Sequence, residues 1–418
     1  MLLIHVHDKP VAIFTKTDSQ VQVQYLQACN KDDAINPSMP VREKEYVFDG
    51  IPPFLTSLMP DDTRRTEVTK ALGIDFDDFQ NLIKHTLGVY NIGHIKVTPA
   101  LDGIQLGENA VDGLSVSSPV PPMLTATSVE ILARPDVQEL LPKEIQRKAG
   151  VSGIGGHFPK AFLNTPEGNF IVKNYSVDFT LCKKENVAAM ESETLRAAKY
   201  AGLPAAKAKA YGHFLAVQRF DTAEPTKVHH LKDMTGVKNK YQGSYEGLRT
   251  IIEEHCGKAA GKEFTKQVIY ALLVGDSDKH QENCAILEKG GKFELAPVYD
   301  SLPSKLVVAG NEDLGLTLGG RKTKIGWEQL TDFATGYLEP SELSTFMQRA
   351  IRGIEQLVLP VSGGLRKSLA RHTFLYSHIA QGKSYGEASK SLAQTVSAKH
   401  EPEQEIEDTK LSDFEIDI

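Results

Sequence analysis

Two short runs rich in β-branched and aromatic residues, Val11–Phe14 and Val21–Tyr25, predict strands near the start of the chain. Between residues 54 and 87, apolar residues recur at helical spacing instead. We therefore expect a small α+β unit over residues 1–112. Proline and serine are frequent in the next segment, 113–124, which predicts a linker because proline cannot continue a helix.

A strand-rich lobe that contains one helix is predicted for residues 125–235. Two strand patterns, Ala161–Leu163 and Asn169–Lys173, are separated by a turn sequence. Alternation along the second strand fixes the face on which Lys173 lies, at the strand end. The helical pattern that follows, from about Val187 to Ala201, stops before a glycine and a proline.

A mainly helical lobe is predicted for residues 236–397. The pattern of a buried helix stops at Gly275, and an irregular polar segment follows it. Two short apolar runs then flank the turn Lys289–Lys292, which predicts a hairpin. The last segment, 398–418, is acidic and poor in aromatic residues, so we expect it to be disordered. The chain as a whole is predicted to be α+β.

Composition narrows the class of protein. The chain has 418 residues, of which 41% are hydrophobic and 24% charged, a balance typical of soluble globular proteins. A formal net charge of -7 excludes a strongly basic nucleic-acid-binding chain, although not a local basic patch. The first residues lack the features of a signal peptide, and no apolar run approaches the roughly 18 residues of a membrane span. Four widely spaced cysteines are expected to be buried free thiols in a reducing cytoplasm: Cys29, Cys182, Cys256 and Cys284.

The polar segment after Gly275 carries the candidate chemistry. Asp278 and Asn283 are five residues apart, the spacing at which protein kinases place a catalytic base and a metal-binding asparagine. Asp300 follows the predicted hairpin, which would return it close to Asn283, and these oxygen ligands suit Mg2+. The spacing alone is a weak signal, because most Asp-rich loops are simply solvated. Its place between a buried helix and a hairpin strengthens it.

The earlier lobe supplies matching parts. The glycine-rich run Gly150–Lys160 can bring backbone N–H groups close to phosphate oxygens. Lys173 is placed to pair with those phosphates, and Glu191 or Glu193 on the next helix can hold it there. The segment Gln218–Asp221 follows a predicted strand and suits a hinge that binds adenine. A structural turn, surface glutamates and an ordinary strand end would explain each part alone, but their order is more specific.

These residues resemble those of a known family, the HipA-type kinases, which are the toxin components of bacterial toxin–antitoxin pairs. The resemblance covers about residues 1–395 and is most specific over 275–300. The stretches that carry it are Pro53–Pro60, Gly88–His94, Gly155–Lys160, Gln218–Asp221, His230–Asp233, Gly275–Asn283 and Leu295–Asp300.

The resemblance implies a bilobal protein-kinase-like (HipA-type) fold and a serine/threonine protein kinase that uses ATP and Mg2+. It implies Asp278 as the catalytic base, Lys173 on the phosphates, and Asn283 and Asp300 as magnesium ligands. The nucleotide-binding residues that it implies, together with the hinge, are Ser152, Gly153, Ile154, Gly155, Gly156, His157, Lys160, Lys173, Gln218, Arg219, Phe220, His280, Asn283 and Asp300.

The family register favours Glu191 over Glu193 as the partner of Lys173. The resemblance also implies autophosphorylation of Ser152 in the glycine-rich loop. This chain departs from the family at Asp276, where asparagine is usual, and at Gln218, where glutamate is frequent. Both departures bear on how the nucleotide is bound.

The family's protein targets are aminoacyl-tRNA synthetases, phosphorylated on a serine, and its usual partner is a helix-turn-helix antitoxin of HipB type. The resemblance therefore implies indirect contact with DNA, through the antitoxin, and no membrane association. Two other classes fit the residues: a small-molecule or lipid kinase of related fold, and a non-catalytic ATP-binding or repressor-complex subunit.

Overall fold

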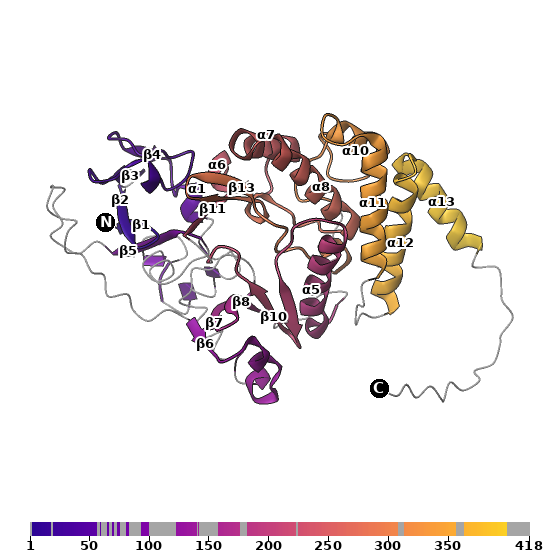
Figure 1. The fold of residues 1–418 in the computed structure, drawn as a ribbon, viewed down its shortest axis with the longest axis horizontal. Helices are drawn as coiled ribbons and strands as arrows, with labels where there is room; N and C mark the ends of the chain where they lie inside the picture. Colours follow the sequence, from indigo (N-terminus) through magenta and orange to yellow (C-terminus); the bar gives the residue numbers. More distant parts are fainter. Residues whose placement is uncertain are drawn as a thin grey trace.

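The computed structural model describes most of the chain, and Figure 1 shows its course. The described residues are 2–17, 20–56, 59, 65–66, 69–70, 73–75, 81–82, 93–99, 123–139, 141, 158–175, 182–222, 225–307, 313–356 and 363–398. The N-terminal sheet lies at one end of the molecule, and the helices of the C-terminal part lie at the other end (Figure 1).

An antiparallel sheet forms the N-terminal unit, in the order β4-β3-β2-β1-β5. The inner strand β1, between β2 and β5, is buried along its whole length and packs with β2, β3 and the short helix α1 in one apolar core. The predicted α+β character of this unit is thus confirmed in its described residues. Its elements are β1 (Leu2–Val6), β2 (Lys9–Lys16), β3 (Val21–Tyr25), β4 (Tyr46–Phe48), β5 (Ile95–Pro99) and α1 (Pro53–Thr56).

A second five-stranded sheet has the order β6-β7-β8-β10-β9 and is covered by one long helix, α5 (Lys184–Tyr200). β7 and β8 form the predicted hairpin, and β6 pairs with β7 in parallel. The strands are β6 (Met123–Thr125), β7 (Lys160–Thr165), β8 (Gly168–Asn174), β9 (Ala208–Tyr211) and β10 (Phe214–Gln218).

A small third sheet joins β11 (Thr226–His230) to the hairpin of β12 (Ala285–Lys289) and β13 (Lys292–Leu295). β11 and the following helix α6 (Leu231–Thr235) fall inside the predicted first lobe, 125–235. In the structure β11 is hydrogen-bonded to a hairpin of the second lobe. We therefore propose that the lobe boundary lies between β10 and β11.

Helices make up most of the remainder: α7 (Tyr245–Cys256), α8 (Lys258–Val274), α9 (Ser304–Val307), α10 (Trp327–Ala334), α11 (Pro340–Glu355), α12 (Gly363–Ile379) and α13 (Tyr385–Ala398). None of the helices in the described part of the chain is long and apolar enough to cross a membrane.

The other predicted domain limits, including the linker 113–124 and the tail 398–418, stay predictions. Residues 113–122 and 399–418 lie outside the described residues.

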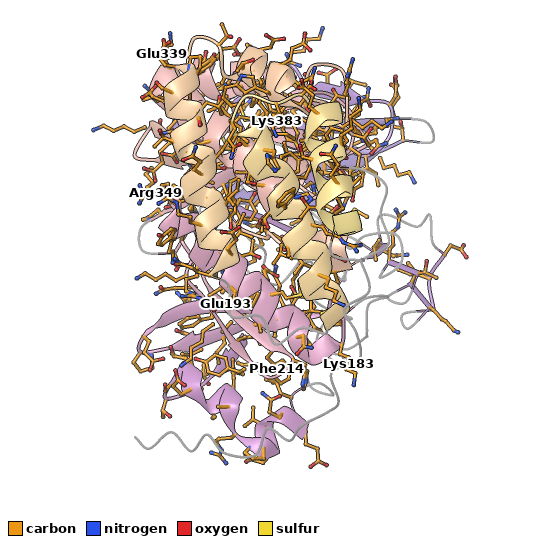
Figure 2. All side chains as sticks on the ribbon, turned by 90° about the vertical axis from the view of Figure 1, so that its right-hand side faces the viewer. Lys183, Glu193, Phe214, Glu339, Arg349 and Lys383 are labelled. Carbon is orange, nitrogen blue, oxygen red and sulfur yellow. The ribbon has the colours of Figure 1, made fainter. Side chains whose placement is uncertain are left out.

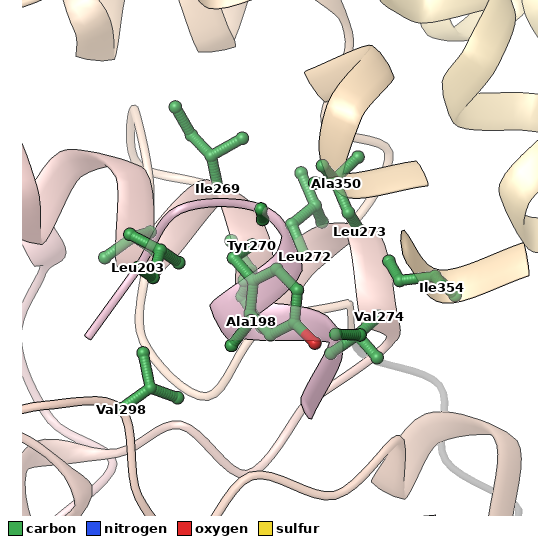
Figure 3. Packing of buried hydrophobic residues seen from close by; sticks show 14 of the residues in the cluster. Ala198, Leu203, Ile269, Tyr270, Leu272, Leu273, Val274, Val298, Ala350 and Ile354 are labelled. Atoms are coloured by element: carbon green, nitrogen blue, oxygen red, sulfur yellow. The ribbon is translucent and has the colours of Figure 1, made fainter. Parts of the chain in front are cut away.

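α8 is the central helix of the core. Its last two turns, Ile269–Val274, are buried on every side, which explains the unbroken apolar run in the sequence. Figure 3 shows these residues packed between Leu203 and Val298 on one side and Ala350 and Ile354 of α11 on the other. Gly275 ends the helix with a left-handed φ of 79°, a conformation that glycine adopts without strain.

α5 is also anchored to the helical part, through α11. The guanidinium Nε of Arg349 donates to the carbonyl of Tyr200 at 2.8 Å. A side chain at Gly353 would lie 2.8 Å from the ring of Tyr200, so the two helices approach too closely for any larger residue. Figure 2 labels Arg349 on α11 and Glu193 on α5, the two helices that meet here.

Candidate functional site

A buried ion pair joins the second sheet to α5. Lys173, near the end of β8, places its Nζ 2.6 Å from Oε1 of Glu191, and both side chains are almost inaccessible to solvent. The other carboxylate oxygen of Glu191 accepts a hydrogen bond from the hydroxyl of Tyr175. Glu193 faces elsewhere and accepts a hydrogen bond from Nε of Arg196 at 3.1 Å. Of the two glutamates, Glu191 is therefore the one that contacts Lys173.

Asp300 approaches the same lysine from the helical lobe. Its Oδ1 accepts a hydrogen bond from Nζ of Lys173, across 127 positions of sequence. Asp300 has a φ of 49°, one of three positive values among non-glycine residues in the described part of the chain. Such a conformation is costly for a residue with a side chain and is concentrated at functional sites. The turn after β13 thus aims the carboxylate at the lobe that carries Lys173.

The contacts among Lys173, Glu191 and Asp300 shift the pKa of each group. Burial alone would lower the pKa of Lys173, but the carboxylates of Asp300 and Glu191 outweigh burial and raise that pKa. The Asp300 side chain is 43% exposed, so burial opposes its charged form only in part, and Lys173 and then Lys160 hold its pKa below the usual range. Burial raises the pKa of Glu191. With both carboxylates ionised, the three groups sum to one negative charge, which suits a cation.

The segment between α8 and β12 forms a compact loop. The amide nitrogen of Asn283 donates to the carbonyl of Asp278 at 3.0 Å, which closes the loop and leaves the amide oxygen as the end that can bind a ligand. The side chain of Asp278 is 52% exposed, whereas Asn283 is buried. Asp278 is thus open to a substrate, and Asn283 is a fixed part of the frame.

Residues outside the loop between α8 and β12 pack against its backbone. The hydroxyl of Tyr245 donates to the carbonyl of Lys279 at 2.7 Å. A Cβ at Gly315 would lie 2.9 Å from the same carbonyl, so this backbone contact requires glycine. The loop backbone between Asp278 and Asn283 is therefore fixed by packing.

Asp276 links the two acidic loops and was not assigned a site role from the sequence. Its Oδ1 accepts the backbone N–H of Asp278 at 3.2 Å, and its Oδ2 accepts the hydroxyl of Ser301 at 2.9 Å. Ser301 is the neighbour of Asp300. Burial, with a smaller contribution from the charge of Asp278 and against the opposing charge of Lys279, raises the pKa of Asp276 to about 7. In the sequence, the feature that could have indicated a site role for Asp276 is its position directly after the end of the buried helix α8.

His280 is buried beside Asp278, with Nε2 3.9 Å from its carboxylate. Its Nδ1 has no hydrogen-bond partner within the described residues. Burial, followed by the charge of Lys240, lowers the pKa of His280 well below its usual value, so the ring is neutral. An unpaired buried nitrogen is costly, which favours a polar ligand at this position. Contact of His280 with phosphate stays a prediction.

The donor chemistry around Asp300 and Asn283 fits Mg2+. Both offer hard oxygen ligands, and Mg2+ in phosphoryl-transfer sites is held by one or two carboxylates together with substrate phosphates. Within the described residues, no group of three His, Cys, Asp or Glu residues gathers to form an all-protein metal cage.

Other predicted nucleotide residues are engaged in structural contacts. Lys160 lies opposite Lys173 in the β7–β8 register, and its charge acts on Asp300. The guanidinium of Arg219 pairs with Asp221 at 2.7 Å. The ring of Phe220 packs against Tyr299, and the amide nitrogen of Gln218 donates to the carbonyl of Glu167 at 3.4 Å. The remaining predicted residues lie outside the described residues: Ser152, Gly153, Ile154, Gly155, Gly156 and His157.

The four cysteines are free thiols. Cys182 and Cys284 are buried, whereas Cys29 and Cys256 are partly exposed. The expectation of free thiols is thus confirmed, but burial holds for only two of the four.

Comparisons with known proteins agree with this geometry. The HipA N-terminal domain matches residues 2–98, and the HipA-like C-terminal domain matches residues 152–358. A solved complex of the Shewanella oneidensis MR-1 toxin–antitoxin system, of HipA, HipB and operator DNA, contains a chain that matches with a TM-score of 0.60 and 17% identity. The match covers 93% of this chain and 99% of that chain, and shows a shared fold.

Two other matches cover less of this chain. A Haemophilus influenzae protein named "Putative kinase" is 26% identical over 196 residues, which are 39% of this chain and 55% of that protein. This chain therefore matches about half the length of that relative. The Helicobacter pylori proinflammatory kinase CtkA has a TM-score of only 0.37 and 15% identity, over 57% of this chain and 93% of that chain. That score is too low to support an argument about the fold.

The N-terminal and C-terminal HipA domains occur in order and together span most of the chain. The α+β, bilobal, protein-kinase-like fold expected from the sequence is confirmed. The chain belongs to the HipA family.

Proposed function

We propose that this chain is a serine/threonine protein kinase of HipA type that transfers the γ-phosphate of ATP, with Mg2+, to a serine of a protein. One observation carries the proposal: Lys173 of one lobe meets Glu191 of α5 and Asp300 of the other lobe at a single point. Asp300 is tied through Ser301 and Asp276 to the loop of Asp278. Phosphoryl transfer needs this placement of charge more than it needs covalent chemistry.

In this mechanism each residue has a separate role in binding or in proton transfer. Lys173 binds phosphate oxygens, and Asn283 and Asp300 would hold Mg2+. When bound, Mg2+ neutralises charge on the transferring phosphate. Asp278 orients the serine hydroxyl and accepts its proton as the serine oxygen bonds to the γ-phosphorus. The bond from phosphorus to the β,γ-bridging oxygen breaks, and ADP leaves with that electron pair.

The same proposal includes partners and regulation. The HipA chain that shares this fold was solved with HipB and operator DNA, which supports a helix-turn-helix antitoxin of HipB type as the partner here and contact with DNA through it. We further propose an aminoacyl-tRNA synthetase as the target, autophosphorylation at Ser152, and a cytoplasmic location. These parts follow from family membership.

The decisive experiment uses ATP radiolabelled at the γ-phosphate, Mg2+ and a cell lysate as the source of acceptors. We expect label in protein, lost in Asp278→Asn. Asp332→Asn, an exposed aspartate on α10, is the matched control and should behave as wild type.

Other outcomes separate the alternatives. Label that appears in metabolites or lipids, and not in protein, would favour a small-molecule or lipid kinase. Absence of Mg2+-dependent ATP binding would favour a non-catalytic subunit. Equal labelling by wild type and Asp278→Asn would reject Asp278 as the base.

A further inference from the structure

A buried lysine of α6 forms an ion pair with the loop between α8 and β12. Nζ of Lys232 lies 2.6 Å from Oε1 of Glu282, and the two side chains are only 6% and 19% exposed. Lys240 lies farther away, with Nζ 3.7 Å from the other carboxylate oxygen. Glu282 directly precedes Asn283, which is expected to bind Mg2+. The ion pair therefore acts on the residue next to a proposed metal ligand.

The main chain of Glu282 is held as well as its side chain. Its carbonyl oxygen accepts hydrogen bonds from Nδ1 of His230 at 2.8 Å and from the hydroxyl of Tyr299 at 2.9 Å. This carbonyl belongs to the planar peptide group that joins Glu282 to Asn283, so the two bonds fix the orientation of that group. Tyr299 is the neighbour of Asp300, and its contact joins the two segments that carry the proposed Mg2+ ligands.

α6 contacts the chain on both sides of Asn283. Before it, the hydroxyl of Thr235 donates to Oε1 of Gln281 at 2.6 Å. After it, the carbonyl of Cys284 accepts the backbone N–H of Leu231 at 2.9 Å. Leu231 is fully buried, which fixes α6 in the core. Asn283 is thus held between neighbours that the same short helix binds.

The other end of the loop is held differently. The hydroxyl of the exposed Tyr241, in the segment between α6 and α7, donates to Oδ1 of Asp278. The Asp278 side chain is exposed, whereas Asn283 is buried. A change in α6 should therefore act on Asn283 more than on Asp278.

We propose that Lys232 is a positioning residue for Mg2+ binding. Through its ion pair with Glu282 it fixes the peptide group of Asn283, and with it the amide oxygen that would bind the metal. Loss of a group that orients a metal ligand commonly lowers metal affinity or activity by about 10- to 100-fold. This inference rests on the proposed kinase function, and it adds a residue outside the predicted ligands on which that function depends.

The test replaces the lysine with Lys232→Met, which keeps most of the side-chain length and removes the charge. We expect the affinity for Mn2+ in the presence of ADP, measured by electron paramagnetic resonance of free Mn2+, to fall about tenfold. Without nucleotide or metal, hydrogen exchange at the N–H of Asn283 should become faster, because the carbonyl of His280 in the same loop accepts it at 2.9 Å. KM for a protein acceptor should stay as in wild type, since Asp278 is held separately.

Lys227→Met is the matched control. Lys227 is also a buried lysine paired with a glutamate, since its Nζ lies 3.5 Å from Oε1 of Glu288, and it belongs to β11, directly before α6. We expect this variant to lose stability but to keep wild-type Mn2+ affinity and wild-type exchange at Asn283. An equal loss of Mn2+ affinity in Lys227→Met and Lys232→Met would show a general effect of losing a buried lysine and would overturn the inference.

A second variant covers the case in which Lys232→Met does not fold. Removing both members of a buried ion pair destabilises less than removing one, so Lys232→Met combined with Glu282→Gln should fold. It should show the same fall in Mn2+ affinity, because the two residues act as a unit. Wild-type affinity in a folded variant would overturn the inference and leave the kinase proposal intact. Failure of wild type both to bind Mn2+ with ADP and to label protein would remove both.

Discussion

The two ends of the candidate site are built differently. At the nucleotide end, Lys173 and Glu191 are buried and paired, and Asp300 closes on them from the other lobe. At the acceptor end, the Asp278 carboxylate is exposed and bound by an exposed tyrosine. Buried charges hold a fixed geometry because each is costly without its partner, whereas exposed contacts exchange readily with solvent or ligand. The nucleotide end is therefore fixed and the acceptor end is exchangeable.

The largest expected effect comes from breaking the fixed end with Lys173→Met. Phosphate transfer should fall by about 10²- to 10³-fold, because a pre-oriented positive charge on the phosphates is lost. The free energy of unfolding should fall by about 3 kcal/mol, since Glu191 is left buried without its cation. Labelling assays and urea unfolding monitored by circular dichroism would measure the two effects.

The control for Lys173→Met is Lys209→Met. Lys209 also pairs with a glutamate, Glu130, at 2.7 Å, but both side chains are mostly exposed. We expect no loss of activity and no measurable loss of stability from Lys209→Met. Equal destabilisation by the two variants would contradict the contrast between buried and exposed charge.

The second prediction concerns Asp276, which connects the two ends and whose effect is on the pH dependence of stability. Its pKa is about 7 in the folded protein and near 3.9 in an unfolded chain, so the folded state holds its proton more tightly. The resulting stability is complete below about pH 4 and is lost as pH rises to about 7. Asp276→Asn should remove this loss, which is on the order of 4 kcal/mol. Unfolding free energies of wild type and variant, compared from pH 4 to 8, should therefore diverge as pH rises.

The control for the pH series is again Asp332→Asn, which changes an exposed aspartate. Its unfolding free energy should follow that of wild type at every pH. A constant difference between wild type and Asp276→Asn would mean that Asp276 does not titrate in this window.

The sequence predicted the fixed end better than the exchangeable end. The buried run of α8, the β12–β13 hairpin and the positions of Asn283 and Asp300 follow from apolar periodicity and spacing, which are local. The residues alone did not decide whether Glu191 or Glu193 pairs with Lys173. The rotation of α5 over β8 determines this, and it depends on the packing of α5 on β10 and α11. The family register favoured Glu191, which is the glutamate in contact with Lys173.

Non-local pairing accounts for what the sequence did not predict. β11 joins a hairpin that follows it by more than 50 residues, so its own pattern could not assign it to a lobe. Tyr241 meets Asp278 across 37 positions, and an exposed tyrosine in a polar segment has no periodic signal. The role of Asp276 as a link depends on Ser301, which the fold brings to it.

The smallest expected effect separates the two glutamates of α5. Glu191→Gln keeps the shape and one acceptor oxygen but removes the charge, so Lys173 is drawn toward Asp300 and away from phosphate. We expect kcat/KM for ATP to fall about tenfold, equivalent to about 1.4 kcal/mol. Glu193 lies two residues further along α5 and, among the described contacts, is paired only with Arg196. Glu193→Gln should therefore leave kcat/KM unchanged. Because both variants make the same chemical change on the same helix, a fall of equal size in both would show that α5 charge in general, and not the Lys173–Glu191 contact, fixes the nucleotide end.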